Sequence, residues 1–73
     1  MSRVVVKSEI TGNMWKIEVA VGDAVEEEQQ VAIIESMKME IPVITPVAGT
    51  VVEILINEGD PIAEEQAVLV VET

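Results

Sequence analysis

Short runs of β-branched apolar residues, separated by polar turns, follow one another along the whole chain. The runs at residues 14–21 and 51–58 each lead into a Gly-Asp pair, and those at 31–36 and 68–73 each follow an acidic loop. A shorter first strand is predicted over residues 4–10. The chain has fourteen Val and nine Ile but only two Leu, and β-branched side chains favour sheets over helices. The pattern therefore predicts an all-β fold.

The second half of the chain repeats the first. A shift of 37 residues lays residues 12–36 over 49–73, and nine of the 25 aligned positions are identical, where chance would give roughly two or three. The identical pairs are Gly12/Gly49, Ile17/Ile54, Gly22/Gly59, Asp23/Asp60, Glu27/Glu64, Glu28/Glu65, Gln29/Gln66, Val31/Val68 and Glu35/Glu72. Two copies are too few for a solenoid. They predict one domain over residues 1–73, in which two small antiparallel sheets pack face to face about a pseudo-two-fold axis.

The segment between the two copies, residues 37–48, contains the most informative stretch. The stretch over residues 31–44 is longer than one ordinary strand and has to reverse direction. Its most polar part is Glu35 to Glu40, so a hairpin turn is predicted there. The stretch has none of the Asn-Gly or Asp-Gly pairs that favour such turns, and Met or Lys at positive φ carries strain. A turn without good turn residues is a candidate functional site.

The chain has three lysines, and Lys38 is the one that falls in this predicted turn. Lys7 and Lys16 are interpreted as solvated charges on a sheet face. Taken alone, Met37 and Met39 would more often fill a core than recognise a partner. A turn at this place, however, exposes at least one of them beside Lys38, and an exposed apolar residue at a loop tip indicates contact with another protein.

Composition excludes several kinds of function. The net charge of −10 disfavours nucleic acid and anionic membrane surfaces, and no apolar run approaches the ~20 residues of a membrane span. Without Cys or His there is no disulfide and no thiolate or imidazole metal site. The acidic run from Glu26 to Glu28 lacks the ligand spacing of a calcium loop and is interpreted as solvated, so no metal is expected. Residues 1–10 lack the apolar core and the cleavage site of a signal peptide. We therefore expect a cytoplasmic protein.

The hexapeptide Glu35-Ser36-Met37-Lys38-Met39-Glu40, followed by Pro46-Val47-Ala48-Gly49-Thr50-Val51, resembles the biotinyl domain of the biotin carboxyl carrier family. The resemblance covers almost the whole chain, including both Gly-Asp turns. Because no other module accompanies the motif, the chain is most similar to the free-standing members of the family, the biotin/lipoyl attachment proteins. In this family the fold is a flattened β-barrel of two four-stranded sheets.

The resemblance implies that Lys38 carries covalent biotin at a hairpin tip. The biotin would shuttle carboxylate between the biotin carboxylase and carboxyltransferase sites of a biotin-dependent (acyl-CoA) carboxylase. A biotin protein ligase is then a further partner, and Glu35, Ser36, Met37, Met39 and Glu40 are the expected recognition residues. The free protein is expected to be a monomer.

Two departures from the family pattern stand out. Ser36 occupies a place where the family often has Ala, and its small size is expected to be tolerated. The protruding thumb insertion and the Pro/Ala-rich upstream linker of bacterial acetyl-CoA carboxylase carriers are absent from the sequence, which argues against that particular carrier.

Two alternatives within the same fold stay open. A lipoyl carrier for a 2-oxo acid dehydrogenase or for glycine cleavage would tend to have Asp before and Ala after its lysine, and Met37 and Met39 depart from that pattern. An unmodified structural barrel-sandwich, as in efflux membrane-fusion proteins, would lack a lysine at the tip. Catalysis by the chain itself is not expected, because only Glu and Asp could do acid–base work and no pocket is evident.

Overall fold

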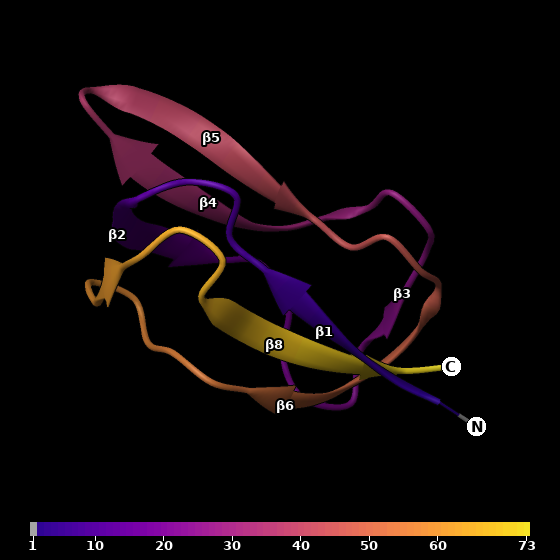
Figure 1. The fold of residues 1–73 in the computed structure, drawn as a ribbon. Helices are drawn as coiled ribbons and strands as arrows, with labels where there is room; N and C mark the ends of the chain where they lie inside the picture. The colour runs from indigo at the N-terminus through magenta and orange to yellow at the C-terminus, as the bar shows by residue number, and fades with distance from the viewer. Residues whose placement is uncertain (1) are drawn as a thin grey trace.

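The computed structural model describes residues 2–73; Met1, the first residue of the predicted 1–73 domain, lies outside them. It contains eight strands: β1 (Arg3–Lys7), β2 (Gly12–Ile17), β3 (Ala24–Val25), β4 (Gln30–Ser36), β5 (Met39–Ile44), β6 (Gly49–Ile54), β7 (Pro61–Ile62) and β8 (Ala67–Glu72). They form two four-stranded antiparallel sheets with strand orders β1-β8-β6-β3 and β5-β4-β2-β7 (Figure 1). The all-β, two-sheet fold expected from the sequence is confirmed. Residues 2–73 contain no helix, and therefore none that could span a membrane.

Three strands are shorter than the apolar pattern predicted. The first ends at Lys7 and not at residue 10, because Ser8 is buried and its hydroxyl donates to the Ile10 carbonyl oxygen at 2.6 Å, which turns the chain. β2 and β6 end at Ile17 and Ile54 and not at residues 21 and 58. One further amide on each side still bonds to the neighbouring strand, Glu18 to Val31 and Leu55 to Val68 at 2.9 Å each. The chain then turns toward the Gly-Asp pairs, although apolar residues continue in the sequence.

Each sheet contains strands from both halves of the repeat, and the repeat reaches further than the sequence comparison found. The amide of Glu28 donates to the Thr45 carbonyl oxygen at 2.8 Å, and the equivalent amide of Glu65 donates to Ser8 at 2.7 Å. Ser8 and Thr45 are themselves 37 residues apart. The shift therefore also relates β1 to β5, where Val6 and Val43 form the one identical pair.

The pseudo-two-fold relation puts the chain ends opposite the β4–β5 turn. Thr73 is equivalent to Ser36, and its amide donates to the Ser2 carbonyl oxygen at 2.8 Å, which holds the two ends of the chain together. The molecule measures 37 × 19 × 18 Å. Figure 1 shows the β4–β5 hairpin tip at one extreme and both chain ends at the other. The hairpin tip is therefore free of the terminal segments.

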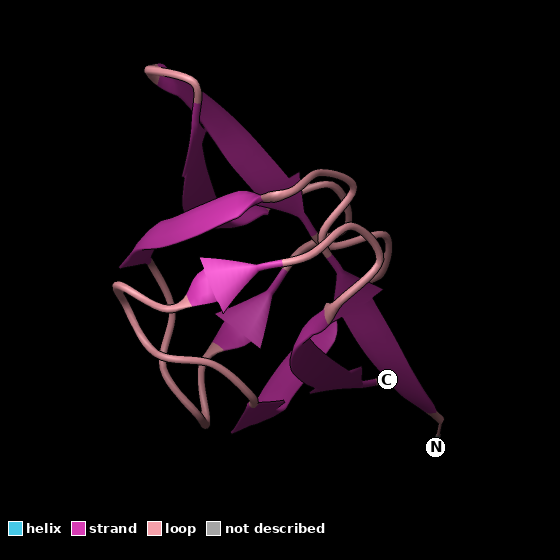
Figure 2. Cartoon of the chain, turned by 60° about the vertical axis from the view of Figure 1, so that its left-hand side comes forward, coloured by secondary structure: helices cyan, strands magenta, loops and turns pink. Residues whose placement is uncertain are grey.

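A single apolar core fills the space between the sheets. Its most completely buried large side chains are Met14, Ile34, Ile62 and Leu69. Of these, Met14 and Ile34 are paired across β2 and β4, so the strand that leads to the hairpin is anchored in the core. The hairpin itself extends beyond the body of the molecule (Figure 2).

Gly12 provides a test of how closely β2 approaches β4. A Cβ atom on Gly12 would lie 2.5 Å from the Glu35 carbonyl oxygen and 2.8 Å from Cγ2 of Ile34. Gly12→Ala should therefore lower the free energy of unfolding by ~1–3 kcal/mol through overpacking, measured by urea denaturation. The control Thr50→Ala, at an exposed strand position, should stay within ~0.5 kcal/mol of the parent. Equal stability of the Gly12 variant and the parent would show that β2 can move away from β4 at this position without cost.

Candidate functional site

The β4–β5 hairpin closes through a two-residue turn. Its register pairs Ile34 with Ile41, Glu35 with Glu40 and Ser36 with Met39. Only Met37 and Lys38 remain between the strands, so the hairpin predicted for this stretch is confirmed and Lys38 lies at its tip. The pairing of β4 with β5 leaves two residues for the turn. The sheet therefore determines where Lys38 lies.

The turn adopts a backbone conformation that its residues do not favour. The φ angles are 50° at Met37 and 66° at Lys38, as the mirror-image type I′ turn of two-residue hairpins requires. Asn-Gly is the preferred pair there, and an L-residue with a side chain costs roughly 1–2 kcal/mol in this region. The strain that the sequence predicted is therefore present at both positions. Strain of this kind persists where the surrounding structure imposes it and is concentrated at functional sites.

Both methionines of the hairpin face solvent. Met37 is 93% exposed and Met39 62% exposed, so the alternative that they fill the core is wrong. Lys38 is exposed as well. Within residues 2–73, no hydrogen bond or ion pair involves its amine. The tip thus presents a primary amine between two apolar, flexible side chains.

Two carboxylates face each other in the second residue pair below the turn. Glu35 and Glu40 are cross-strand partners and both are exposed. Like charges in such pairs destabilise a hairpin slightly, and the single ion pair among the described residues, Arg3 with Glu72 at 3.4 Å, lies elsewhere. The lysine is therefore presented above an acidic pair that has no cationic partner within residues 2–73.

Ser36 joins the hairpin to the body of the domain. Its hydroxyl donates to the Thr11 carbonyl oxygen at 2.9 Å, and the residue is half-buried. This contact links the end of β4 to the loop before β2. Among the five residues expected to serve recognition, Ser36 is the one whose polar group is already engaged within the domain.

The other two lysines occupy strands. Lys7 ends β1. Lys16 lies in β2 at an irregularity in the β2–β4 register that leaves both Trp15 and Lys16 exposed, and its Nζ atom lies 5.5 Å from the centre of the Trp15 ring. Of the three lysines, only Lys38 is in a turn. The exposure of Trp15, the single aromatic residue, was not evident from the sequence, since strand alternation does not reveal a bulge.

No cluster of three or more acidic side chains suited to a metal ion occurs within residues 2–73. The triplet Glu26 to Glu28 is exposed, as expected for a solvated loop.

Comparison with known proteins identifies the class. The Biotin_lipoyl family model, described as "Biotin-requiring enzyme", matches residues 4–71. The chain therefore belongs to the biotin/lipoyl attachment family and is a biotinyl-type carrier domain, not a catalytic one.

Two bacterial relatives resemble the chain in sequence. It is 50% identical over 44 residues to the biotin/lipoyl attachment protein of Bacillus subtilis (strain 168), covering 60% of each chain. It is 41% identical over 44 residues to the biotinylated protein TB7.3 homolog of Mycobacterium leprae, covering 60% of this chain and 62% of that one. In both cases the matched region spans less than two thirds of the relative.

Two solved structures match as parts of much larger chains. The urea carboxylase of Kluyveromyces lactis superposes with a TM-score of 0.92 and 39% identity, over 99% of this chain and 6% of that one. A single-chain, multi-domain long-chain acyl-CoA carboxylase superposes with a TM-score of 0.88 and 21% identity, over 97% of this chain and 7% of that one. The second likeness establishes the fold alone.

The strained turn yields a stability prediction. Met37→Asn places a residue that tolerates positive φ at the first turn position and should raise the free energy of unfolding by about 1 kcal/mol. The control Met39→Asn, in the adjoining strand, should give no gain. Urea denaturation of both variants measures the difference. An unchanged or lowered stability of Met37→Asn would mean that the turn carries no strain.

Proposed function

We propose that this chain is a biotin carboxyl carrier and that Lys38 is the residue to which biotin is attached. When bound, biotin supplies the carboxylate-transfer chemistry, accepting carboxylate at a biotin carboxylase site and releasing it at a carboxyltransferase site. The domain itself supplies the attachment point, the tether and the recognition surface.

The observation that carries the proposal is the position of Lys38. It lies in a two-residue turn at the end of the molecule opposite to both chain ends, with Met37 and Met39 exposed beside it. A primary amine can form an amide with the carboxyl group of biotin, and an exposed tip can enter the active site of another enzyme. Tethering raises the concentration of the attached group at both sites to the order of millimolar.

A biotin protein ligase is required because the carboxyl group of biotin has to be activated before it can form an amide. The ligase presents this activated acyl group to the lysine and takes up the protons that Nζ loses. The amide bond then forms at Nζ as the activating group leaves, and one positive charge is lost from the tip. The exposed carboxylates of Glu35 and Glu40 offer anionic contacts to such a partner, with Met37 and Met39 offering apolar ones.

The relatives support carboxylase partners. The Kluyveromyces lactis structure, 39% identical, is a urea carboxylase, and an Emericella nidulans protein described as a putative urea carboxylase is 44% identical over 39 residues, which cover 53% of this chain and 3% of that one. We infer that biotin carboxylase and carboxyltransferase domains or subunits act on the arm. A single-domain organisation, a monomeric free state and a cytoplasmic location stay predictions of the sequence.

Lipoate is the second candidate because the Bacillus relative is named for both groups. The side chains beside Lys38 favour biotin, since Met37 and Met39 stand where lipoyl domains tend to have Asp and Ala. An amide at the same amine would serve either group, so the two functions share one attachment site.

Replacing the lysine tests the proposal directly. Lys38→Arg should abolish labelling by a biotin ligase and by a lipoyl ligase, because a guanidinium does not form the amide. Stability should stay within ~0.5 kcal/mol, since the side chain is exposed. Intact mass after incubation with each ligase, together with peptide mapping, provides the measurement.

Lys7→Arg and Lys16→Arg are the matched controls, and both should accept one group as the parent does. A Lys38→Arg variant that still gains the mass of biotin would contradict the assignment. A large loss of stability in that variant would show that Lys38 is structural.

A further inference from the structure

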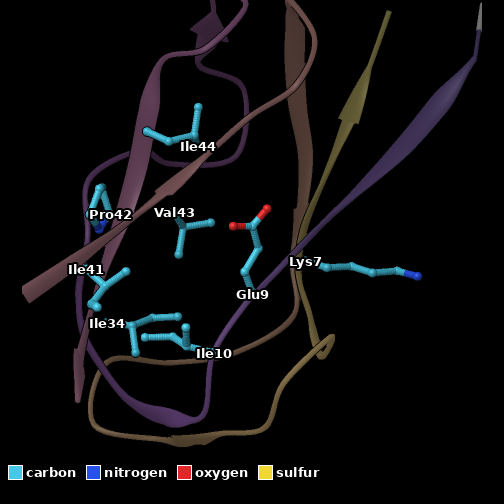
Figure 3. A pocket seen from close by; sticks show the side chains of 8 residues that line it. All are labelled: Lys7, Glu9, Ile10, Ile34, Ile41, Pro42, Val43 and Ile44. Atoms are coloured by element: carbon cyan, nitrogen blue, oxygen red, sulfur yellow. The ribbon is translucent and has the colours of Figure 1, made fainter. Parts of the chain in front are cut away.

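A groove with a volume of about 220 Å³ opens beside the hairpin, between β5 and the segment that follows β1. Its walls are mainly apolar and include Ile10, Ile34, Ile41, Val43 and Ile44 (Figure 3). Small-molecule sites in proteins commonly combine such apolar walls with a few polar groups. The volume is small for such a site and suits one small ring system.

Glu9, an exposed residue at the edge of this groove, contributes a carboxylate to it. Figure 3 shows its carboxylate turned toward Val43, whereas the Lys7 side chain points away. Within residues 2–73, no hydrogen bond or ion pair involves this carboxylate. An ionised carboxylate only accepts hydrogen bonds, so the groove is suited to an apolar ligand that carries N–H donors.

The groove begins close to the tip. Ile34 and Ile41 are paired across the hairpin and form the third residue pair below the turn. Ile41 follows Lys38 by three residues, or about 10 Å at ~3.3 Å per strand residue. An amide-linked biotin would have about eleven bonds of roughly 1.5 Å between the lysine Cα atom and its ring, enough to cover this distance when the arm folds back along β5.

From these observations we propose that the groove is a resting site for the biotin ring of the same chain, an inference that rests on the proposed attachment at Lys38. The ureido half of biotin carries two N–H donors, which match the Glu9 carboxylate, and charge-assisted hydrogen bonds of this type are stronger than neutral ones. The sulfur-containing half is apolar and matches the isoleucine walls. The dithiolane ring of lipoate has no N–H donor, so Glu9 makes the groove selective for biotin.

A weak site is sufficient for this role. Because the tether holds the ring at a concentration on the order of millimolar, a dissociation constant in the same range leaves the groove occupied about half of the time. The ring then remains free to leave for an enzyme active site. The groove thus shields the apolar half of the ring system from water between visits without trapping it.

Methyl NMR of the biotinylated chain tests the proposal. With ¹³C-methyl-labelled Ile and Val, attachment of biotin should shift Ile10, Ile34 and Ile41 and give nuclear Overhauser contacts from the ring to them. Ile54 and Ile56, outside the groove, should not shift. Unchanged groove methyls would overturn the proposal, as would shifts confined to Val5 and Val6, which line a neighbouring hollow.

Two variants separate the role of Glu9 from a general effect of charge. Glu9→Ala should reduce the biotin-induced shifts severalfold. Glu53→Ala, which removes an exposed acid of β6 that does not line the groove, should leave them as in the parent. Equal shifts in Glu9→Ala and the parent would overturn the pairing of ring and carboxylate. A lipoylated chain with equally large groove shifts would overturn the selectivity for biotin.

The failure of this inference is distinguishable from failure of the proposed function. Intact mass establishes first whether biotin is attached. If it is not, the proposed function fails, and titration of the unmodified chain with biocytin at millimolar concentration still tests the groove. Shifts of the same three isoleucines that weaken in Glu9→Ala would support the site, and no shift would overturn it.

Discussion

The two-residue turn at Met37 and Lys38 is the constraint on which the rest of the site depends. It holds both residues at positive φ, and it is kept there by a register that pairs Ile34 with Ile41 on the core side of the hairpin. Because side chains alternate along a strand, a slip of one strand by one residue would turn its core-facing side chains to the opposite face of the sheet. Burial of the core-facing side chains of β4 and β5 thus imposes the strained turn. The turn, in turn, determines the position of the Lys38 amine.

The internal duplication places this turn at the end of the molecule opposite to both chain ends (Figure 1). Under the pseudo-two-fold relation, the place equivalent to the hairpin tip is occupied by the chain ends, where Thr73 contacts Ser2. The first half of the repeat therefore continues into a strained, exposed loop, whereas the equivalent place in the second half holds the contact between Thr73 and Ser2. A carrier needs such an unobstructed end, because its arm has to enter the active sites of other proteins.

The sequence predicted most of the fold and the tip of the site. The Gly-Asp pairs, acidic loops and β-branched runs indicated the repeat. The length of the stretch over residues 31–44, with its most polar part from Glu35 to Glu40, predicted a hairpin at Lys38. The equivalence of β1 and β5 was missed because it rests on backbone contacts of Ser8 and Thr45 and on a single identical pair, Val6 and Val43. The groove and the Ser36–Thr11 contact join segments far apart in the chain, and no local pattern encodes them.

The most direct test of this account exchanges Met37 and Lys38. The exchange keeps composition, charge and both positive-φ positions but moves the amine by one residue. If the position of the amine on the turn is what the ligase reads, biotin labelling should slow tenfold or more, the equivalent of ~1.4 kcal/mol of transition-state positioning, while the thermal melt is unchanged. Labelling at the parent rate in the folded variant would contradict the account.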